Sequence, residues 1–306
     1  MWILLAFLSA ALLGFYDVFK KRALRDNAVI PVLLINTVLC SLFFLPLIVG
    51  SSVGMLAAGD AAYVPAGGWR EHGYVVLKSL IVLSSWLCGY FAIKHLPLTI
   101  VGPVNASRPV MTLVGALLIF GEQLNLWQWV GVLLALLSFY LLNRSGKKEG
   151  IDFVHNRWVF FLFLAAILGA CSGLYDKYLL SPMSAGGAGL DKMFVQGWYN
   201  LYQALMMLAV TLLLWWPTSH RTTPFSWRWS IVCISVFLTL ADLAYFYALS
   251  MPGVLISVVS MVRRSSVLVS FLFGALVFHE KNLKAKALDL LLVLLGVLFL
   301  YFGTEA

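Results

Sequence analysis

The sequence predicts an all-α polytopic membrane protein with ten transmembrane helices arranged as two inverted five-helix repeats. Three observations lead to this fold class. Hydrophobic residues make up 62% of the 306 residues and charged residues only 11%, whereas soluble domains carry about a quarter charged residues. Ten apolar stretches each have about the length that a helix needs to cross a hydrocarbon core. A four-residue motif recurs 159 residues further along the chain.

The ten predicted spans follow one another with short connections. In the first half they lie near residues 2–19, 29–50, 74–93, 97–120 and 126–143. In the second half they lie near residues 158–178, 193–216, 229–249, 252–278 and 287–303. The longest connection, residues 51–72, is rich in Gly and Ala and is expected to form a surface helix or a simple loop. Ten helices leave too little chain for a soluble catalytic domain.

The sequence carries no motif for nucleotide or metal chemistry. A phosphate-cradling Gly-rich loop, an H-E-x-x-H motif and a zinc-ligand spacing are all missing, so ATP-driven transport and metalloprotease chemistry have no support. The four cysteines lie inside apolar spans without C-x-x-C spacing and are expected to be buried small hydrophobic residues. We therefore expect no cofactor, no metal and no catalytic residues.

The internal repeat is the strongest signal of organisation. The first span ends in the motif Gly14–Asp17 and the sixth in the closely similar Gly173–Asp176. The hairpins Tyr90–Pro97 and Tyr245–Pro252 also correspond, and each leads through an arginine to Gly-Ala-Leu and a glutamate. Five spans per repeat is an odd number, so the second copy must enter the membrane from the opposite face. The predicted repeats are residues 1–148 and 149–306; a purely structural gene duplication is the alternative.

Two arginines occupy matching places in the repeats. Arg108 lies eleven residues after Pro97, and Arg263 lies eleven residues after Pro252. At 1.5 Å of rise per residue, both fall near the middle of a ~30 Å hydrocarbon core, where a charge is costly and usually functional. Arg264 adds a third guanidinium. Because guanidinium groups match the geometry of carboxylates and phosphates, we expect these three residues to bind an anion or, alternatively, to pair with internal carboxylates.

Three aspartates are the candidate internal carboxylates. Asp242 lies about a dozen residues into the eighth span and is a candidate partner for Arg263 or Arg264. Asp17 and Asp176 lie about a turn from span ends, where they are expected to act as gates or proton-coupling groups. The alternative for these two is simple pairing with the neighbouring Lys20 or Lys177.

Neutral polar and aromatic residues complete the predicted substrate site. Asn105 shares a helix face with Arg108, because the two residues are three positions apart. The remaining candidates are Asn36, Asn200, Tyr16, Tyr175, Trp86, Tyr90 and Tyr245. The amides, with Gln203, suit sugar hydroxyls or amides, and the aromatic rings suit stacking on a ring. Amides also join transmembrane helices without any ligand, and aromatic residues also form interfacial belts.

The repeated hairpins and the Gly-rich fourth and ninth spans, which end at Gly121-Glu122 and His279-Glu280, give this chain a family resemblance. It resembles the drug/metabolite transporter superfamily, and EamA-type carriers in particular, over nearly its whole length. The resemblance implies a single-chain secondary carrier with a central cavity lined by helices one to four and six to nine, with helices five and ten at the periphery. The triose-phosphate and nucleotide-sugar branches hold phosphate with basic residues on helices four and nine, and the three arginines look similar.

The orientation in the membrane has two conflicting indications. Fourteen Lys and Arg residues follow odd-numbered spans, at positions 20, 21, 22, 25, 94, 144, 147, 148, 157, 221, 228, 281, 284 and 286, whereas the other face has four, at 70, 78, 177 and 192. The positive-inside rule makes the richer face cytoplasmic and puts both termini outside. The family resemblance implies termini in the cytoplasm, with residues 20–22 then forming a basic vestibule that attracts anions.

The sequence therefore predicts a secondary transporter, not an enzyme, that moves a small polar anion bearing phosphate or carboxylate by alternating access. The alternatives are an exporter of amino acids or amphipathic drugs, and a lipid-phosphate flippase or membrane-embedded enzyme. The expected partners are a small-molecule substrate, protons or a counter-substrate, and the lipid bilayer of a bacterial inner membrane. We expect a monomer or homodimer and no nucleic-acid partner.

Overall fold

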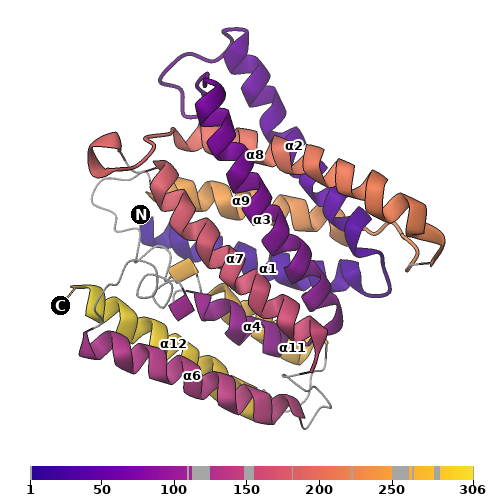
Figure 1. The fold of residues 1–306 in the computed structure, drawn as a ribbon, viewed down its shortest axis with the longest axis vertical. Helices are drawn as coiled ribbons and strands as arrows, with labels where there is room; N and C mark the ends of the chain where they lie inside the picture. Colours follow the sequence, from indigo (N-terminus) through magenta and orange to yellow (C-terminus); the bar gives the residue numbers. More distant parts are fainter. Residues whose placement is uncertain are drawn as a thin grey trace.

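The structure is a computed structural model that describes residues 2–108, 110–111, 125–147, 155–180, 182–221, 223–249, 262–263, 265–278 and 283–305. The described residues form helices joined by short connections, as Figure 1 shows. Four helical segments among them are long and apolar enough to cross a membrane, namely Val29–Ser52, Trp69–His95, Arg157–Leu180 and Lys192–Ser219. The predicted all-α polytopic membrane fold is confirmed.

The helices of the first half are α1 (Trp2–Leu24), α2 (Val29–Ser52), α3 (Trp69–His95), α4 (Leu98–Ala106) and α6 (Leu126–Lys147). Those of the second half are α7 (Arg157–Leu180), α8 (Lys192–Val210), α9 (Trp229–Leu249), α11 (Ser266–Leu276) and α12 (Leu283–Glu305). A π-helical turn (Thr211–Trp215) and a 3-10 turn (Trp216–Arg221) continue α8, and a short 3-10 helix spans Met183–Ala185. Arg264, Glu122, His279 and Glu280 lie outside the described residues.

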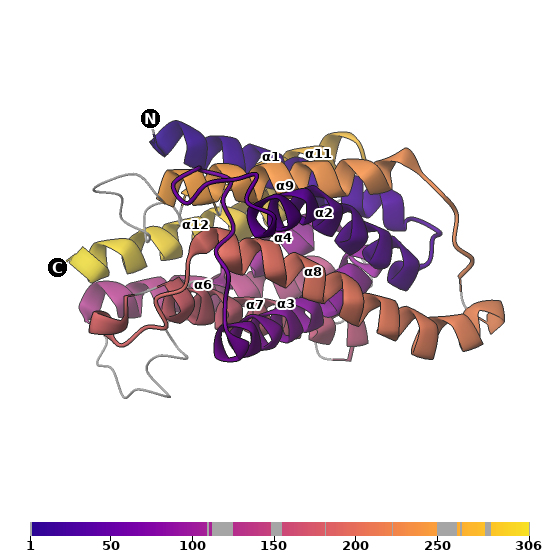
Figure 2. The same cartoon turned by 90° about the horizontal axis from the view of Figure 1, so that it is seen from above.

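Helices of the two halves pack against each other in pairs. α1 lies along α9, α3 along α7, α2 along α8, α4 along α11 and α6 along α12. The pair α6 and α12 runs along one edge of the molecule in Figure 1, apart from α2 and α8, and in Figure 2, seen from above, the same pair lies behind the other helices. The expectation that the fifth and tenth helices are peripheral therefore agrees with the position of α6 and α12.

Side chains near the ends of α1 and α3 form hydrogen bonds with the connecting segments at one end of the molecule. The Asn27 amide donates hydrogen bonds to the carbonyls of Ala23 (3.0 Å) and Ser226 (2.8 Å), and its oxygen accepts from the backbone N–H groups of Ala28 and Ser226 (both 2.9 Å). Lys21 donates to the carbonyls of Ile93 and Leu96 at the end of α3. These bonds satisfy carbonyls that the helix ends leave unpaired and join α1, α3 and the segment before α9.

The charge count that assigned lysines to membrane faces needs correction. Lys78, counted on the poorer face, lies inside α3 with 5% of its surface exposed, and it forms an ion pair with Asp176. Lys20 and Lys286, counted on the richer face, are also buried within helices. A helical lysine can bury its long stem and hold a partner within the protein, so position near a span end does not make it a loop charge. The corrections remove charges from both faces and leave the sign of the bias unchanged.

Glycines allow α11 to approach two helices of the first half closely. A Cβ atom on Gly14 of α1 would lie 2.4 Å from the Cβ of Val269 and 2.9 Å from the Ser266 carbonyl oxygen. A Cβ on Gly102 of α4 would lie 2.7 Å from Val267 Cγ1. Helices pack this closely in membranes only where small residues leave room for the neighbouring backbone. α11 is thus held against both α1 and α4 by glycine contacts.

We expect Gly14→Ala to destabilise the protein by about 1–3 kcal/mol, because the new methyl group overlaps Val269 and backbone of α11 that cannot move aside easily. The measurement is the Tm of the purified protein in detergent. Gly73→Ala in α3 is the matched control: no described atom lies within 4 Å of its Cβ position, so its Tm should stay equal or rise. Equal melting of the two variants would contradict the close α1–α11 contact.

Candidate substrate site

Charged side chains of the helices form two networks, and the buried Lys286 and Asp289 of α12 lie outside both. The first network contains Tyr16, Asp17 and Lys20 of α1, Tyr90 of α3 and Arg108. Lys20 Nζ lies 2.7 Å from Asp17 Oδ1 and 4.2 Å from the centre of the Tyr16 ring. The hydroxyl groups of Tyr16 and Tyr90 lie 3.4 Å apart. The alternative predicted for Asp17, pairing with Lys20, is therefore present in the structure.

Arg108 lies one turn after Asn105 and adds a further cation to this network. Its Nη2 donates to the Asn105 side-chain oxygen at 3.1 Å, as their shared helix face predicts. Its charge interacts with those of Asp17 and Lys20. The guanidinium also rests on Gly169 of α7, where a Cβ atom would come within 2.7 Å of it. Arg108 therefore links the first half to α7 at a point where only glycine leaves space.

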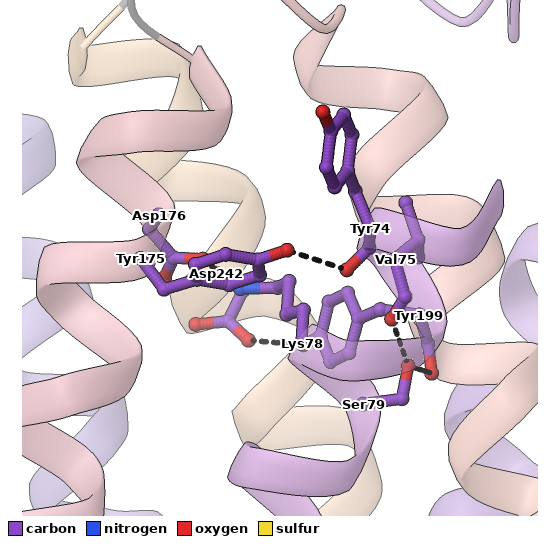
Figure 3. A network of polar contacts seen from close by, with 8 residues as sticks. All are labelled: Tyr74, Val75, Lys78, Ser79, Tyr175, Asp176, Tyr199 and Asp242. Atoms are coloured by element: carbon purple, nitrogen blue, oxygen red, sulfur yellow. Dashed lines mark hydrogen bonds and ion pairs between the residues drawn. The ribbon is translucent and has the colours of Figure 1, made fainter. Parts of the chain in front are cut away.

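The second network joins residues of α3, α7, α8 and α9 to Arg263, which precedes α11. Lys78 of α3 forms an ion pair with Asp176 of α7, and its ammonium lies 4.9 Å from the centre of the Tyr199 ring of α8. Figure 3 shows Lys78, Asp176, Tyr199 and Asp242 gathered at one place. The Tyr199 hydroxyl is 3.5 Å from Asp242 Oδ2 in α9. Asp242 in turn pairs with Arg263, which lies just before α11.

Arg263 is held on two sides within this second network. Its Nη2 bonds to Asp242 Oδ1, so the predicted pairing of Asp242 with an arginine of the ninth span is present. Its guanidinium carbon lies 4.2 Å from the centre of the Tyr245 ring, a distance at which cation and ring attract. The Arg263 Nε is buried and has no hydrogen-bond partner within the described residues. One donor of the guanidinium is thus available for a further acceptor.

The remaining predicted residues lie in different surroundings. Asn36 of α2 accepts a hydrogen bond from Ser235 of α9 at 3.0 Å, and Asn200 of α8 donates to the Gln196 carbonyl at 2.8 Å. The Tyr175 hydroxyl donates to the Tyr74 carbonyl at 3.3 Å, next to Asp176 but outside the ion pair (Figure 3). Trp86 packs against the hydrophobic core. The structure thus brings Asn36 and Asn200 into the α2, α8 and α9 contacts and leaves Trp86 with apolar neighbours.

Sequence reasoning missed Lys78 and Tyr199. It expected Lys177 or no partner for Asp176, whereas the partner is Lys78, 98 residues away in sequence. A usable signal was present, because a lysine five residues inside an apolar span is costly unless it is paired. Tyr199 carried no signal apart from its position next to Asn200.

The formal charges of the two networks do not cancel. The named groups comprise the cations Lys20, Lys78, Arg108 and Arg263 and the anions Asp17, Asp176 and Asp242, an excess of one positive charge. An excess cation inside a membrane protein favours a bound anion, because burial makes an uncompensated charge expensive. Among the described residues, no group of three or more His, Cys, Asp or Glu side chains is arranged to hold a metal ion.

Comparison with known proteins gives a family match for the first half of the chain. The sequence profile of the EamA-like transporter family matches residues 1–144. The resemblance to EamA-type carriers of the drug/metabolite transporter superfamily, predicted from the hairpins and the Gly-rich spans, is confirmed. The first network lies within these matched residues, whereas the second network joins Lys78 of this EamA segment to residues of the second half of the chain.

Two further matches are a relative named as a transporter and a solved structure of similar fold. A curated relative from Archaeoglobus fulgidus, named an uncharacterized transporter, is 22% identical over 178 residues, which are 58% of this chain. The match spans 59% of that relative's length. A solved structure described only as the crystal structure of a protein aligns with a TM-score of 0.59, covering 98% of this chain and 99% of the solved one at 15% identity. At that identity the likeness shows the shared fold alone.

We expect Lys78→Met to lower the Tm of the EamA-type protein, because it leaves Asp176 without its counter-charge. The cost should stay below the ~3–5 kcal/mol of a fully buried broken pair, since 38% of the Asp176 side chain is exposed. The double variant Lys78→Met/Asp176→Asn removes both charges and should recover most of the lost Tm. A double variant that melts as low as Lys78→Met would mean that packing, rather than the unpaired carboxylate, accounts for the loss.

Proposed function

We propose that this protein is a secondary transporter of the bacterial inner membrane that moves a small anionic metabolite, bearing phosphate or carboxylate, by alternating access. The observation that carries the proposal is the partly buried Arg263, which is bonded to Asp242 through one nitrogen, while its buried Nε has no hydrogen-bond partner within the described residues. A guanidinium can bind a carboxylate or phosphate through two nitrogens. An incoming anion can therefore bind Arg263 Nε and compete with Asp242 for the rest of the group.

The anion and Asp242 compete for one cation, which gives a means of coupling. When the substrate takes Arg263, the Asp242 carboxylate loses its counter-charge and must find a proton or another cation. Tyr199 lies between Asp242 and Lys78, so the same change reaches the Lys78–Asp176 pair that joins α3 to α7. We assign Asp17, Asp176 and Asp242 to gating or proton coupling on this basis.

In this proposal, the movement that alternates access is a rocking of the two inverted repeats against each other. The contact of α1 with α9 has its counterpart in the contact of α7 with α3, as exchange of the two halves requires. Each contact includes a hydrogen bond from a serine hydroxyl to a backbone carbonyl of the other helix, from Ser9 to Ala241 and from Ser85 to Ala165, both 2.7 Å. The residues bonded in one contact lie within one helical turn of the positions that the repeat makes equivalent to the residues bonded in the other contact. The correspondence supports rocking of one half against the other.

An amphipathic substrate is a second candidate, supported by a groove on the outside of the helices. The groove has a volume of about 320 Å³ and is lined by Phe7, Val262, Ser265, Leu291, Leu294, Leu295 and Leu298. It lies between α1, α11 and α12, next to the chain position of Arg263. An anion with an apolar tail could place its charge at Arg263 and its tail in this groove. Binding that strengthens with alkyl-chain length would favour this candidate.

The test of the anionic substrate is a thermal-shift measurement with glycerol 3-phosphate, gluconate and the cation tetraphenylphosphonium. A ligand present at 100 times its Kd stabilises the native protein by about 2.7 kcal/mol. We expect the anions to raise the Tm of the wild type and of the exposed-site control Arg25→Ala, but not of Arg108→Ala or Arg263→Ala. Because Arg263→Ala leaves Asp242 unpaired, Arg263→Gln/Asp242→Asn should be measured beside it. Stabilisation by the cation alone would overturn the anionic assignment.

A methyl group at Gly169 should weaken anion binding without removing any charge. Gly169→Ala pushes the Arg108 guanidinium from its place, whereas Gly173→Ala, four residues along the same helix, meets no described atom. We expect a several-fold rise in the Kd of the stabilising anion for Gly169→Ala and an unchanged Kd for Gly173→Ala, both obtained from titrated thermal shifts. Equal affinities would remove Arg108 from the binding site.

A further inference from the structure

We propose that a row of buried amides on α8, together with Asn36 of α2, forms a second subsite that binds hydroxyl or amide groups of the transported anion. The proposal rests on the proposed function, because it assigns the neutral part of the same substrate. It gives Gln196 and Gln203 the role of specificity-determining residues. The substrate class becomes an anion that carries hydroxyl or amide groups, such as a hydroxy acid or a polyol phosphate.

The amides share one face of α8. Gln196, Asn200 and Gln203 are spaced by four and three residues, which places them above one another on a helix. Their exposed fractions are 2%, 3% and 0%, so the whole row is buried. α8 packs along α2, where Asn36 is also fully buried. Four amides are thus buried on two helices that come from different halves of the chain and pack against each other.

The hydrogen bonds of these amides are incomplete. Gln203 has no partner for its Nε2 or its Oε1, Gln196 has none for its Oε1, and Asn36 has none for its Nδ2, within the described residues. Asn27 is a useful contrast, since both its side-chain nitrogen and its oxygen are bonded. Buried polar groups in native proteins nearly always have a partner, and an exception requires an explanation. A ligand absent from this structure would supply the missing partners.

The amide row adjoins the second charged network. Tyr199, next to Asn200, lies 3.5 Å from Asp242 and has Lys78 over its ring. From Asn36, contacts pass through Cys40 to Thr239, which is three residues before Asp242 on α9. A molecule whose anionic group binds Arg263 can therefore present its neutral part to the amides.

The unused atoms identify the chemistry of that neutral part. They include donors, at Asn36 Nδ2 and Gln203 Nε2, and acceptors, at Gln196 Oε1 and Gln203 Oε1. A carboxylate or phosphate only accepts, and would leave the amide oxygens unpaired. An ammonium only donates, and would leave the amide nitrogens unpaired. A hydroxyl or a primary amide both donates and accepts, so it can satisfy the whole set.

The first experiment measures the ligand-free protein and separates a binding amide from a structural one. Replacing an unpartnered buried amide by an apolar group of similar shape removes the cost of burying an unpaired polar group. Gln203→Met should therefore melt at or above the wild-type Tm. The fully bonded Asn27 is the matched control, and Asn27→Leu should melt several degrees lower. A Gln203→Met variant that loses as much as Asn27→Leu would show that the amide is structurally bonded and would overturn the proposal.

The second experiment measures specificity with two matched pairs of anions, glycerol 3-phosphate with propyl phosphate and gluconate with hexanoate. We expect the wild type to bind the hydroxylated member of at least one pair at least tenfold more tightly, because a site built for hydroxyl groups rejects analogues that lack them. Gln203→Met should remove this preference and leave the affinity for the alkyl anion unchanged.

The outcomes separate the inference from the function on which it rests. A wild type that binds both members of each pair equally, or a Gln203→Met variant that keeps the preference, overturns the amide subsite while the anion transporter stands. A wild type that prefers the alkyl members overturns the subsite in favour of the groove beside α12. A wild type that binds none of the four anions overturns the proposed function, and the subsite with it.

Discussion

The structure depends on the pairing of charges that are buried among apolar helices. Where helices face lipid and each other, water is not at hand to solvate an ammonium, a guanidinium or a carboxylate, so each such group needs a partner inside the protein. Lys20 meets Asp17 within α1, whereas Lys78 and Asp176 join α3 to α7, and Arg263 and Asp242 join the segment before α11 to α9. The helix arrangement must keep these partners together.

The same ion pairs that stabilise the fold also limit substrate binding at this site. Each cation that could hold a substrate already has a carboxylate or amide near it, so binding is an exchange of partners rather than the filling of a vacant charge. Such exchange costs less than stripping water from an unpaired ion, because the buried groups are already desolvated. The amides of α8 and α2 are the opposite case, because several of their buried nitrogen and oxygen atoms have no hydrogen-bond partner within the described residues.

The sequence predicted the helices and part of the charge pairing. Apolar stretches mark helices because lipid demands them, and the starts at Val29, Leu126 and Trp229 agree with the predicted spans. α3 begins at Trp69, five residues early, because its first turn is polar and hydropathy does not detect it. The pair Asp242 and Arg263 was predictable from adjacent spans, since only 21 residues separate the two. The pair Lys78 and Asp176 required knowledge that α3 packs on α7, which no local pattern provides.

The ion pair between Lys78 and Asp176 joins a residue of the EamA segment to a residue outside it. A change of charge at either position leaves the other residue without its counter-charge until a second change restores it. The two halves of this protein are therefore expected to evolve together at such positions. A chimaera that combines the first half of this chain with the second half of a relative should be most stable when the relative supplies an acidic residue in place of Asp176.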